Sequence, residues 1–202
     1  MKREAEVKEL LIENAIHLIA TGGFEKATTK ELTYCGGSLP DFKMNEVYIY
    51  RIFGSKEKLY EAAFLRLDYE LFSACKRAAD SLGGFEENTK ERFYQFFLKG
   101  WDFILGNEER CRAYVRYYYS IYFRDNAVAV HNQHFEDVIG VLKPVFKEEA
   151  DVSAIFRSIF LTLFVFAIQV FNGHIMDNEI NRPHIFNVLY CMAMTYFKED
   201  LS

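Results

Sequence analysis

Hydrophobic residues recur mainly three and four positions apart along the chain, which is the spacing of one face of an α-helix. In the first segment this spacing is followed by Val7, Leu10, Leu11, Ala15, Leu18 and Ile19. The same pattern predicts later helices over about Thr29–Tyr34, from an Asn45 cap to Phe53, from a Ser55 cap to about Ala79, and over Thr89–Leu105, Glu108–Phe123, Ala127–Glu149, Ser153–Phe171 and Pro183–Lys198. No segment shows a convincing strand pattern, so we expect an all-α protein.

The ends of these helices are marked by residues that favour caps and breaks. Gly22 and Gly23 predict the end of the first helix, because glycine suits the residue after a helix C-terminus. Thr28 and Glu31 have the spacing of a capping box, with Thr28 as the N-cap. Pro144 predicts a kink or an end within the segment 127–149.

The stretch Val47–Phe53 reads VYIYRIF, a composition more typical of a β-strand than of a helix. A strand here would have no partner elsewhere in the chain, and an isolated strand is not stable. Two predicted helices precede this stretch and one follows it, separated by short turns. We therefore interpret it as the second helix of a helix-turn-helix, whose exposed side chains are set by what they must touch.

The segments FEKATTKEL, from Phe24, and IYRIFGSKEKLYEA, from Ile49, resemble the TetR family of bacterial transcriptional regulators. The resemblance covers about residues 7–65, a third of the chain. It implies a three-helix DNA-binding head (1–55), a connecting helix (56–79) and a helical ligand-binding and dimerisation domain (80–202). The turn CGGSLPDFKMN is about five residues longer than the family pattern. Alternatively, the second helix ends early and the third starts at Asp41.

The resemblance also implies which residues touch DNA. Contacts to phosphate are expected from Thr28, Thr29, Lys43, Tyr50 and Lys56, and contacts to bases from Asn45, Glu46, Tyr48 and Arg51. Arginine pairs with guanine and asparagine with adenine, which suits Arg51 and Asn45. The alternatives are that Tyr50 belongs to the core and that Arg51 and Lys56 are ordinary solvated charges.

The charge of the chain argues against strong non-specific DNA binding. The net charge is −5, and residues 1–60 hold nine Lys/Arg and nine Asp/Glu. A neutral head predicts modest non-specific affinity and a small dependence on salt.

The resemblance implies a homodimer, and the pattern of the last two predicted helices, 153–171 and 183–198, supports it. Both are apolar around most of their circumference, so they must be buried on all sides. A four-helix arrangement with a second copy would bury them. The alternative is that they form the core of a monomer.

Aromatic residues make up 17% of the chain, and many fall between residues 93 and 123. The resemblance implies a small-molecule effector, and apolar walls with a few hydroxyls are how small-ligand cavities are built. The candidates for lining it are Tyr94, Trp101, Tyr118, Tyr122 and Gln169. Such a wall favours a neutral or cationic aromatic compound. The alternative is that the same aromatic stripe is core.

Nothing in the sequence indicates a cofactor, a metal or a membrane span. The four cysteines are far apart, which fits free thiols in the cytoplasm. The N-terminus has no signal-peptide pattern, and the apolar run Ile159–Ile168 is about half the length of a span, so we expect a buried helix. His131 and His134 have a metal-binding spacing but no third ligand in register, so we expect surface histidines.

Together with these patterns, the resemblance implies a ligand-responsive transcriptional regulator, a repressor that binds a near-palindromic operator as a homodimer; activation is the alternative sign. Two rivals stay open. One is a helical enzyme, although no catalytic motif names a nucleophile or a base. The other is a helical adaptor that binds protein and keeps a vestigial DNA head.

Overall fold

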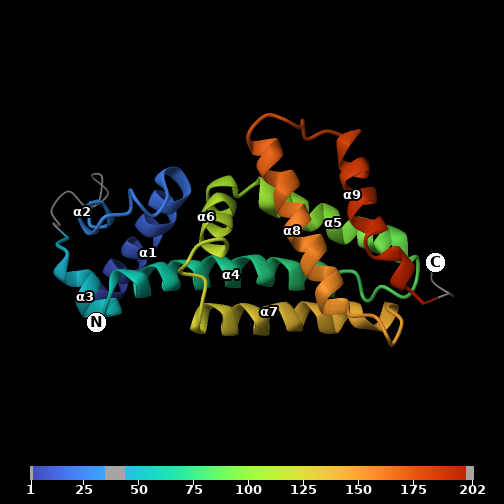
Figure 1. Cartoon of the computed structure of the whole chain (residues 1–202), viewed down its shortest axis with the longest axis horizontal. Helices are drawn as coiled ribbons and strands as arrows, with labels where there is room; N and C mark the ends of the chain where they lie inside the picture. Colours follow the sequence, from blue (N-terminus) through green and yellow to red (C-terminus); the bar gives the residue numbers. More distant parts are fainter. Residues whose placement is uncertain (1, 35–43, 199–202) are drawn as a thin grey trace. The chain divides into compact units, whose positions relative to one another are not determined.

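The computed structural model describes residues 2–34 and 44–198 of the 202-residue chain (Figure 1). Within these ranges the chain is helical: the elements are α1 (Lys2–Gly22), α2 (Thr29–Leu32), α3 (Val47–Phe53), α4 (Lys56–Asp80), α5 (Thr89–Leu105), α6 (Glu108–Tyr118), α7 (Asn126–Leu142), η1 (Lys143–Val145), α8 (Val152–Phe171), α9 (Asn181–Cys191) and η2 (Met194–Tyr196). The extended backbone in the described ranges pairs only as an isolated antiparallel bridge between Phe146 and Phe197. The all-α prediction is confirmed.

The helices form two compact units. The first unit contains the residues up to Tyr69 together with Glu109–His131, and the second contains Glu70–Glu108 and the residues from Asn132 onward. Helix α4 contributes its first half to the first unit and its second half to the second. The functional division at residues 55 and 79 expected from the sequence stays a prediction.

Local capping explains where the first helices begin and end. Gly23, with φ of +75°, follows α1 and its N–H donates to the Ile19 carbonyl at 3.1 Å, as a C-terminal glycine does. Thr28 caps α2, because its hydroxyl accepts the Glu31 N–H at 3.2 Å. In a full capping box the Glu31 side chain would accept the Thr28 N–H. Here the Thr28 N–H donates to the Lys26 carbonyl instead. The predicted helix 29–34 ends at Leu32.

The stretch 47–53 is a helix, as predicted, and its burial shows why its composition is unusual. Ile49 is fully buried, whereas Val47 and Tyr50 are exposed. The predicted Asn45 cap is displaced: α3 starts at Val47, and the Asn45 carboxamide accepts the Val47 N–H at 3.0 Å in a turn before the helix. Ser55 caps α4 as predicted, accepting the Lys58 N–H at 3.2 Å.

Three later helices end earlier than their patterns predict. Helix α6 ends at Tyr118 rather than Phe123, because the Ser120 hydroxyl donates to the Tyr117 carbonyl and accepts the Tyr122 N–H. Helix α7 ends at Leu142, where Pro144 sets a 3₁₀ turn.

The last helix, α9, ends at Cys191 rather than at Lys198, because the chain that follows pairs with the segment after α7. The Lys147 N–H donates to the Tyr196 carbonyl at 2.9 Å, and the Lys198 N–H to the Val145 carbonyl at 3.1 Å. Pro183 lies in the first turn of α9, as predicted.

Helix α8 is strongly apolar but is only partly buried within one chain. Among the described helices it alone is long and apolar enough to cross a membrane by length and composition. Only 22% of its most apolar stretch is buried within the chain, and Val165 is 53% exposed. This burial does not fit the alternative that the helix lies in the core of a monomer, and burial by a second copy stays a prediction.

Candidate DNA interface and ligand cavity

In the first unit α1 contacts both α2 and α3, and hydrogen bonds from α1 and α4 hold the chain around α2. The Asn14 carboxamide on α1 donates to the Leu32 carbonyl at 3.0 Å and to the Tyr34 carbonyl at 3.3 Å, which fixes the end of α2. The buried Tyr60 hydroxyl on α4 donates to the Ala27 carbonyl at 2.6 Å. These bonds tie the end of α2 to α1 and the turn before α2 to α4, so the position of α2 is set by both longer helices.

The exposed side chains at and before α3 form one surface, which we call the α3 outer face: Asn45, Glu46, Val47, Tyr50 and Arg51. The Arg51 guanidinium lies 4.6 Å from the centre of the Tyr48 ring and 4.0 Å from the Glu4 carboxylate. Both contacts are at an exposed site and are therefore weak. Arg51 is thus positioned on the α3 outer face by weak contacts that a contact to DNA can replace.

Eight of the nine residues predicted to contact DNA lie in the described part of the first unit, and five of these eight are exposed. Tyr50 is 53% exposed and so lies outside the core, and Tyr48 is half-buried. Thr28 is exposed at the start of α2, and Thr29 beside it is half-buried. Lys56, at the start of α4, places its ammonium 5.7 Å from the Tyr60 ring centre. Lys43 lies outside the described residues.

Val47 belongs to the same surface and was missed in the sequence. It is 64% exposed, more than Tyr50. Its spacing to Tyr50 and Arg51, three and four residues, places all three on one helix face and was the available signal. An exposed valine suits contact with a thymine methyl group.

Two of the residues predicted to bind a ligand, Tyr118 and Tyr122, lie in the first unit, where they pack among aromatic rings. This tyrosine cluster consists of Phe24, Tyr60, Phe64, Tyr114, Tyr117, Tyr118, Tyr122 and Phe123. The Tyr117 hydroxyl donates to the Tyr122 carbonyl at 2.9 Å. Burial raises the pKa of Tyr60 and of Tyr117 above the ordinary value, so both hydroxyls stay protonated donors.

A buried polar group lies beside this cluster. The Asp68 carboxylate is 2.8 Å from His131 Nδ1, and the Tyr114 hydroxyl donates to the same carboxylate oxygen at 3.2 Å. Asp68 is 0% and His131 1% exposed, so the prediction of a surface histidine is wrong for His131. His131 continues the buried stripe of Ala127 and Phe135, four residues on either side, and this spacing was the missed signal.

His131 and His134 do not share a site. The His134 ring faces Phe72, with ring centres 6.2 Å apart. Among the described residues no group of three or more His, Cys, Asp or Glu could hold a metal ion.

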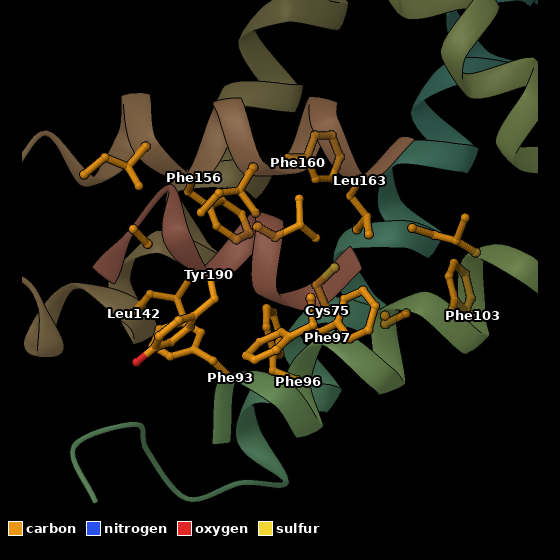
Figure 2. Close-up of a pocket in the computed structure, with 18 of the residues that line it drawn as sticks. Cys75, Phe93, Phe96, Phe97, Phe103, Leu142, Phe156, Phe160, Leu163 and Tyr190 are labelled. Carbon is orange, nitrogen blue, oxygen red and sulfur yellow. The ribbon is translucent and has the colours of Figure 1, made fainter. Parts of the chain in front are cut away.

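The second unit contains a cavity of about 90 Å³ lined by α4, α5, α8 and α9, by the last residue of α7, and by residues that flank the two 3₁₀ turns (Figure 2). Nine of its 21 lining residues are phenylalanine, and none is acidic, basic, an amide or an aliphatic alcohol. In Figure 2, Phe93, Phe96 and Phe97 project from α5, facing Phe156 and Phe160 on α8. The cavity is therefore almost entirely hydrocarbon.

Two polar atoms belong to the lining, the Cys75 thiol and the Tyr190 hydroxyl (Figure 2). Burial raises the pKa of the Cys75 thiol to about 12, so it is uncharged at neutral pH. Burial also raises the pKa of Tyr190. Neither group brings a charge to the wall.

The other predicted ligand residues lie in the second unit, and none of them lines this cavity. Trp101 is fully buried, and its indole N–H donates to the Asp177 carboxylate at 2.9 Å. Tyr94 packs on Phe186, with ring centres 5.0 Å apart. Gln169 is half-buried near the end of α8, and its backbone carbonyl accepts the His174 N–H. None of the five predicted residues lines this cavity, and their roles stay predictions.

The Asp177 carboxylate is also held by Arg182, through bonds of 2.8 and 2.6 Å. Arg182 in turn lies 2.8 Å from Asp102 on α5. These hydrogen bonds hold the pKa of Asp177 below its usual range, so it is ionised at neutral pH. The network joins α5 to the start of α9 on the rim of the second unit.

No protein-family model and no curated protein sequence matches this chain. Solved structures do. A TetR-family transcription regulator from Marinobacter aquaeolei VT8 is 14% identical, with a TM-score of 0.74 over 95% of this chain and 98% of that one. A putative TetR-family regulator from Shewanella sp. PV-4 is 14% identical, with a TM-score of 0.70 over 96% and 99%.

A third similar structure is the multidrug binding protein EbrR complexed with imidazole. It is 14% identical, with a TM-score of 0.63 over 92% of this chain and 93% of that one. At such identities the likeness establishes the architecture, and it extends over both units. The resemblance seen in the first third of the sequence is thus confirmed for the whole fold: this chain has the fold of the TetR-family transcriptional regulators.

Proposed function

We propose that this protein is a ligand-responsive transcriptional regulator that binds a near-palindromic operator as a homodimer and releases it when a small molecule binds, acting as a repressor. The observation that carries the proposal is the division of side chains around the short helix α3. Ile49 is buried on its inner side, whereas Asn45, Tyr50 and Arg51 of the α3 outer face are exposed to solvent. A recognition helix has this division, because base edges are read by polar side chains in the major groove.

The residues proposed to contact DNA carry groups that bind either bases or phosphates. Arg51 presents a guanidinium that matches the two acceptors of guanine, and Asn45 matches adenine. Tyr50, Thr28 and Lys56 present groups that bind phosphate. The Glu46 carboxylate can accept a hydrogen bond from the amino group of cytosine, and it disfavours other bases. Such selection suits a DNA-binding head whose neutral charge gives little non-specific affinity for DNA.

A second copy of the chain is the proposed cover for the apolar face of α8 and α9. The exposed apolar residues there include Val165 on α8 and Val188 on α9, the second 49% exposed. Leaving such a face in water costs free energy in proportion to its area, and burying it against its own copy in a symmetric four-helix arrangement removes that cost.

Helix α4 supplies the proposed route from ligand to DNA. Its residues Leu71, Ala74 and Cys75 line the cavity, and its residue Tyr60 anchors the turn before α2. If α4 can adopt two placements, a ligand that binds more tightly to one of them raises the population of that placement. The arrangement of the DNA-binding heads then shifts with it.

The test is selection of bound sequences from a random DNA duplex pool by wild type, Arg51→Ala and Arg77→Ala. We expect wild type and Arg77→Ala, which changes an exposed arginine of the second unit, to enrich the same near-palindrome. Arg51→Ala should lose about 1–3 kcal/mol of binding at one base position. Failure of wild type to enrich any sequence at low salt would contradict the proposal and favour the adaptor or the enzyme.

The dimer has its own test, Val165→Asp measured by sedimentation. We expect monomers, because a charge in the centre of an apolar interface is not solvated. Ile121→Asp, a change at an 81% exposed residue of the first unit, should leave the dimer intact. A monomeric wild type would contradict the proposal, and flotation of wild type with lipid vesicles would assign the face to a membrane.

A further inference from the structure

We propose that the cavity of the second unit selects small, uncharged, largely hydrocarbon ligands with no more than one ring and rejects cations most strongly. This inference deepens the proposed function and rests on it for its meaning, because a ligand-responsive regulator requires an effector site. The sequence predicted an effector that is either a neutral or a cationic aromatic compound, and this proposal keeps only the neutral class.

The size follows from the volume of the cavity. A water takes about 30 Å³ of liquid volume, and an apolar cavity of about 150 Å³ holds one benzene ring. The volume of about 90 Å³ thus corresponds to about three waters, and a ring enters only when the side chains of the wall shift. A substituted ring requires the aromatic side chains of the wall to move further.

The preference for a neutral ligand follows from the wall. A buried charge is stable only when it is paired or hydrogen-bonded. The 21 lining residues supply no charged group, and their polar side-chain atoms are one neutral thiol and one neutral hydroxyl. An ion entering this cavity would lose its water and gain no counterion.

Aromatic rings attract cations, so the exclusion of cations needs its own argument. The tyrosine of the wall offers the best such surface, but its ring already has a cation near it: the ammonium of Lys90, an exposed residue outside the lining, is 5.7 Å from the Tyr190 ring centre. A second positive charge there would be repelled. We therefore rank a neutral ligand first, an anion second and a cation last.

The experiment compares three probes of one shape, 2-phenylethanol, phenylacetate and 2-phenylethylammonium, by calorimetric titration of the intact protein without DNA. We expect the alcohol to bind at least about tenfold more tightly than the cation, with the anion between them. A cation that binds as tightly as the alcohol, or an absence of binding by all three, would overturn the proposal.

Two glycines provide a matched pair of variants to show that binding occurs in this cavity. Gly100 lies on α5 in the cavity wall, and a Cβ added there meets nothing within 4 Å. Gly140 is a helical glycine of α7 with equally open surroundings, and it is not part of the wall. Gly100→Leu should weaken 2-phenylethanol binding by at least about tenfold by filling the space, whereas Gly140→Leu should not change it.

The outcome separates this proposal from the proposed function. Equal binding by wild type and Gly100→Leu would place the probe elsewhere and overturn the cavity assignment, whatever DNA is bound. Binding with the expected ranking, but with no change in affinity for the selected operator, would support the ligand class and contradict only the coupling to DNA.

Discussion

The tyrosine cluster of the first unit and the phenylalanine-lined cavity of the second are both aromatic, but one is filled and the other is hollow. In the cluster, the rings of Phe64 and Tyr117 stack with centres 4.5 Å apart, and the hydroxyls of Tyr60, Tyr114 and Tyr117 each donate to a carbonyl or a carboxylate. In the cavity wall, nine phenylalanines have no polar atom to orient them.

The difference shows what a tyrosine hydroxyl does inside a helical protein. A buried hydroxyl needs a partner at a fixed distance, so each tyrosine is drawn to one position and its ring packs there. A phenylalanine has no such requirement, and a set of them can surround a space without filling it. Hydrogen-bonded tyrosines therefore fix the aromatic cluster of the first unit, whereas a wall made mostly of phenylalanine surrounds the cavity of the second.

The comparison is tested most strongly by removing one ring from each region. Phe64→Ala should lower the free energy of unfolding by about 4 kcal/mol, because this fully buried ring leaves a new cavity among stacked neighbours. Phe96→Ala, at a half-buried residue beside an existing cavity, should cost about 2 kcal/mol. Urea denaturation measures both, and equal losses would show that the two regions are packed alike.

The next effect concerns the carboxylate that anchors the cluster. Asp68→Ala should lower the free energy of unfolding by about 3 kcal/mol, because His131 and Tyr114 are left buried without their shared acceptor. Asp137→Ala removes an exposed carboxylate of α7 and should change stability by less than about 0.5 kcal/mol. A loss below about 1 kcal/mol for Asp68→Ala would mean that the group is not an anchor.

A smaller change tests a single hydroxyl. Tyr60→Phe removes the donor to the Ala27 carbonyl, and the loss should be about 1–2 kcal/mol. Amide hydrogen exchange should accelerate most in α2, since this bond fixes the turn before it. Tyr119→Phe, at a residue 67% exposed, is the matched control and should alter neither quantity.

The smallest effect has the opposite sign. Gly140→Leu should raise the free energy of unfolding by about 1 kcal/mol, because leucine favours the helix over glycine. Gly100→Leu should raise it further, since its side chain also enters apolar space that is empty. A loss of stability in Gly100→Leu would show that the wall cannot accept a side chain and that the cavity is smaller than its shape suggests.

The helices of this protein could be predicted because the information for them is local. Thr28 and Ser55 cap α2 and α4 through bonds to residues three positions ahead, and Gly23 ends α1 through a bond four positions back. The helical interpretation of 47–53 also held, because a strand there had no partner. Predictions failed where distant segments intervene, as where the 3₁₀ turn after α9 pairs with the chain near Val145.

The amino-acid sequence by itself determined the helices, most of their caps and the resemblance of the head, since each depends on residues a few positions apart. Only the tertiary structure decided which aromatic residues are anchors and which surround a cavity. Tyr60 finds its acceptor 33 residues away and His131 finds Asp68 63 residues away. The periodicity of a helix tells which side chains face inward but carries no information on which partner, or which empty space, they meet there.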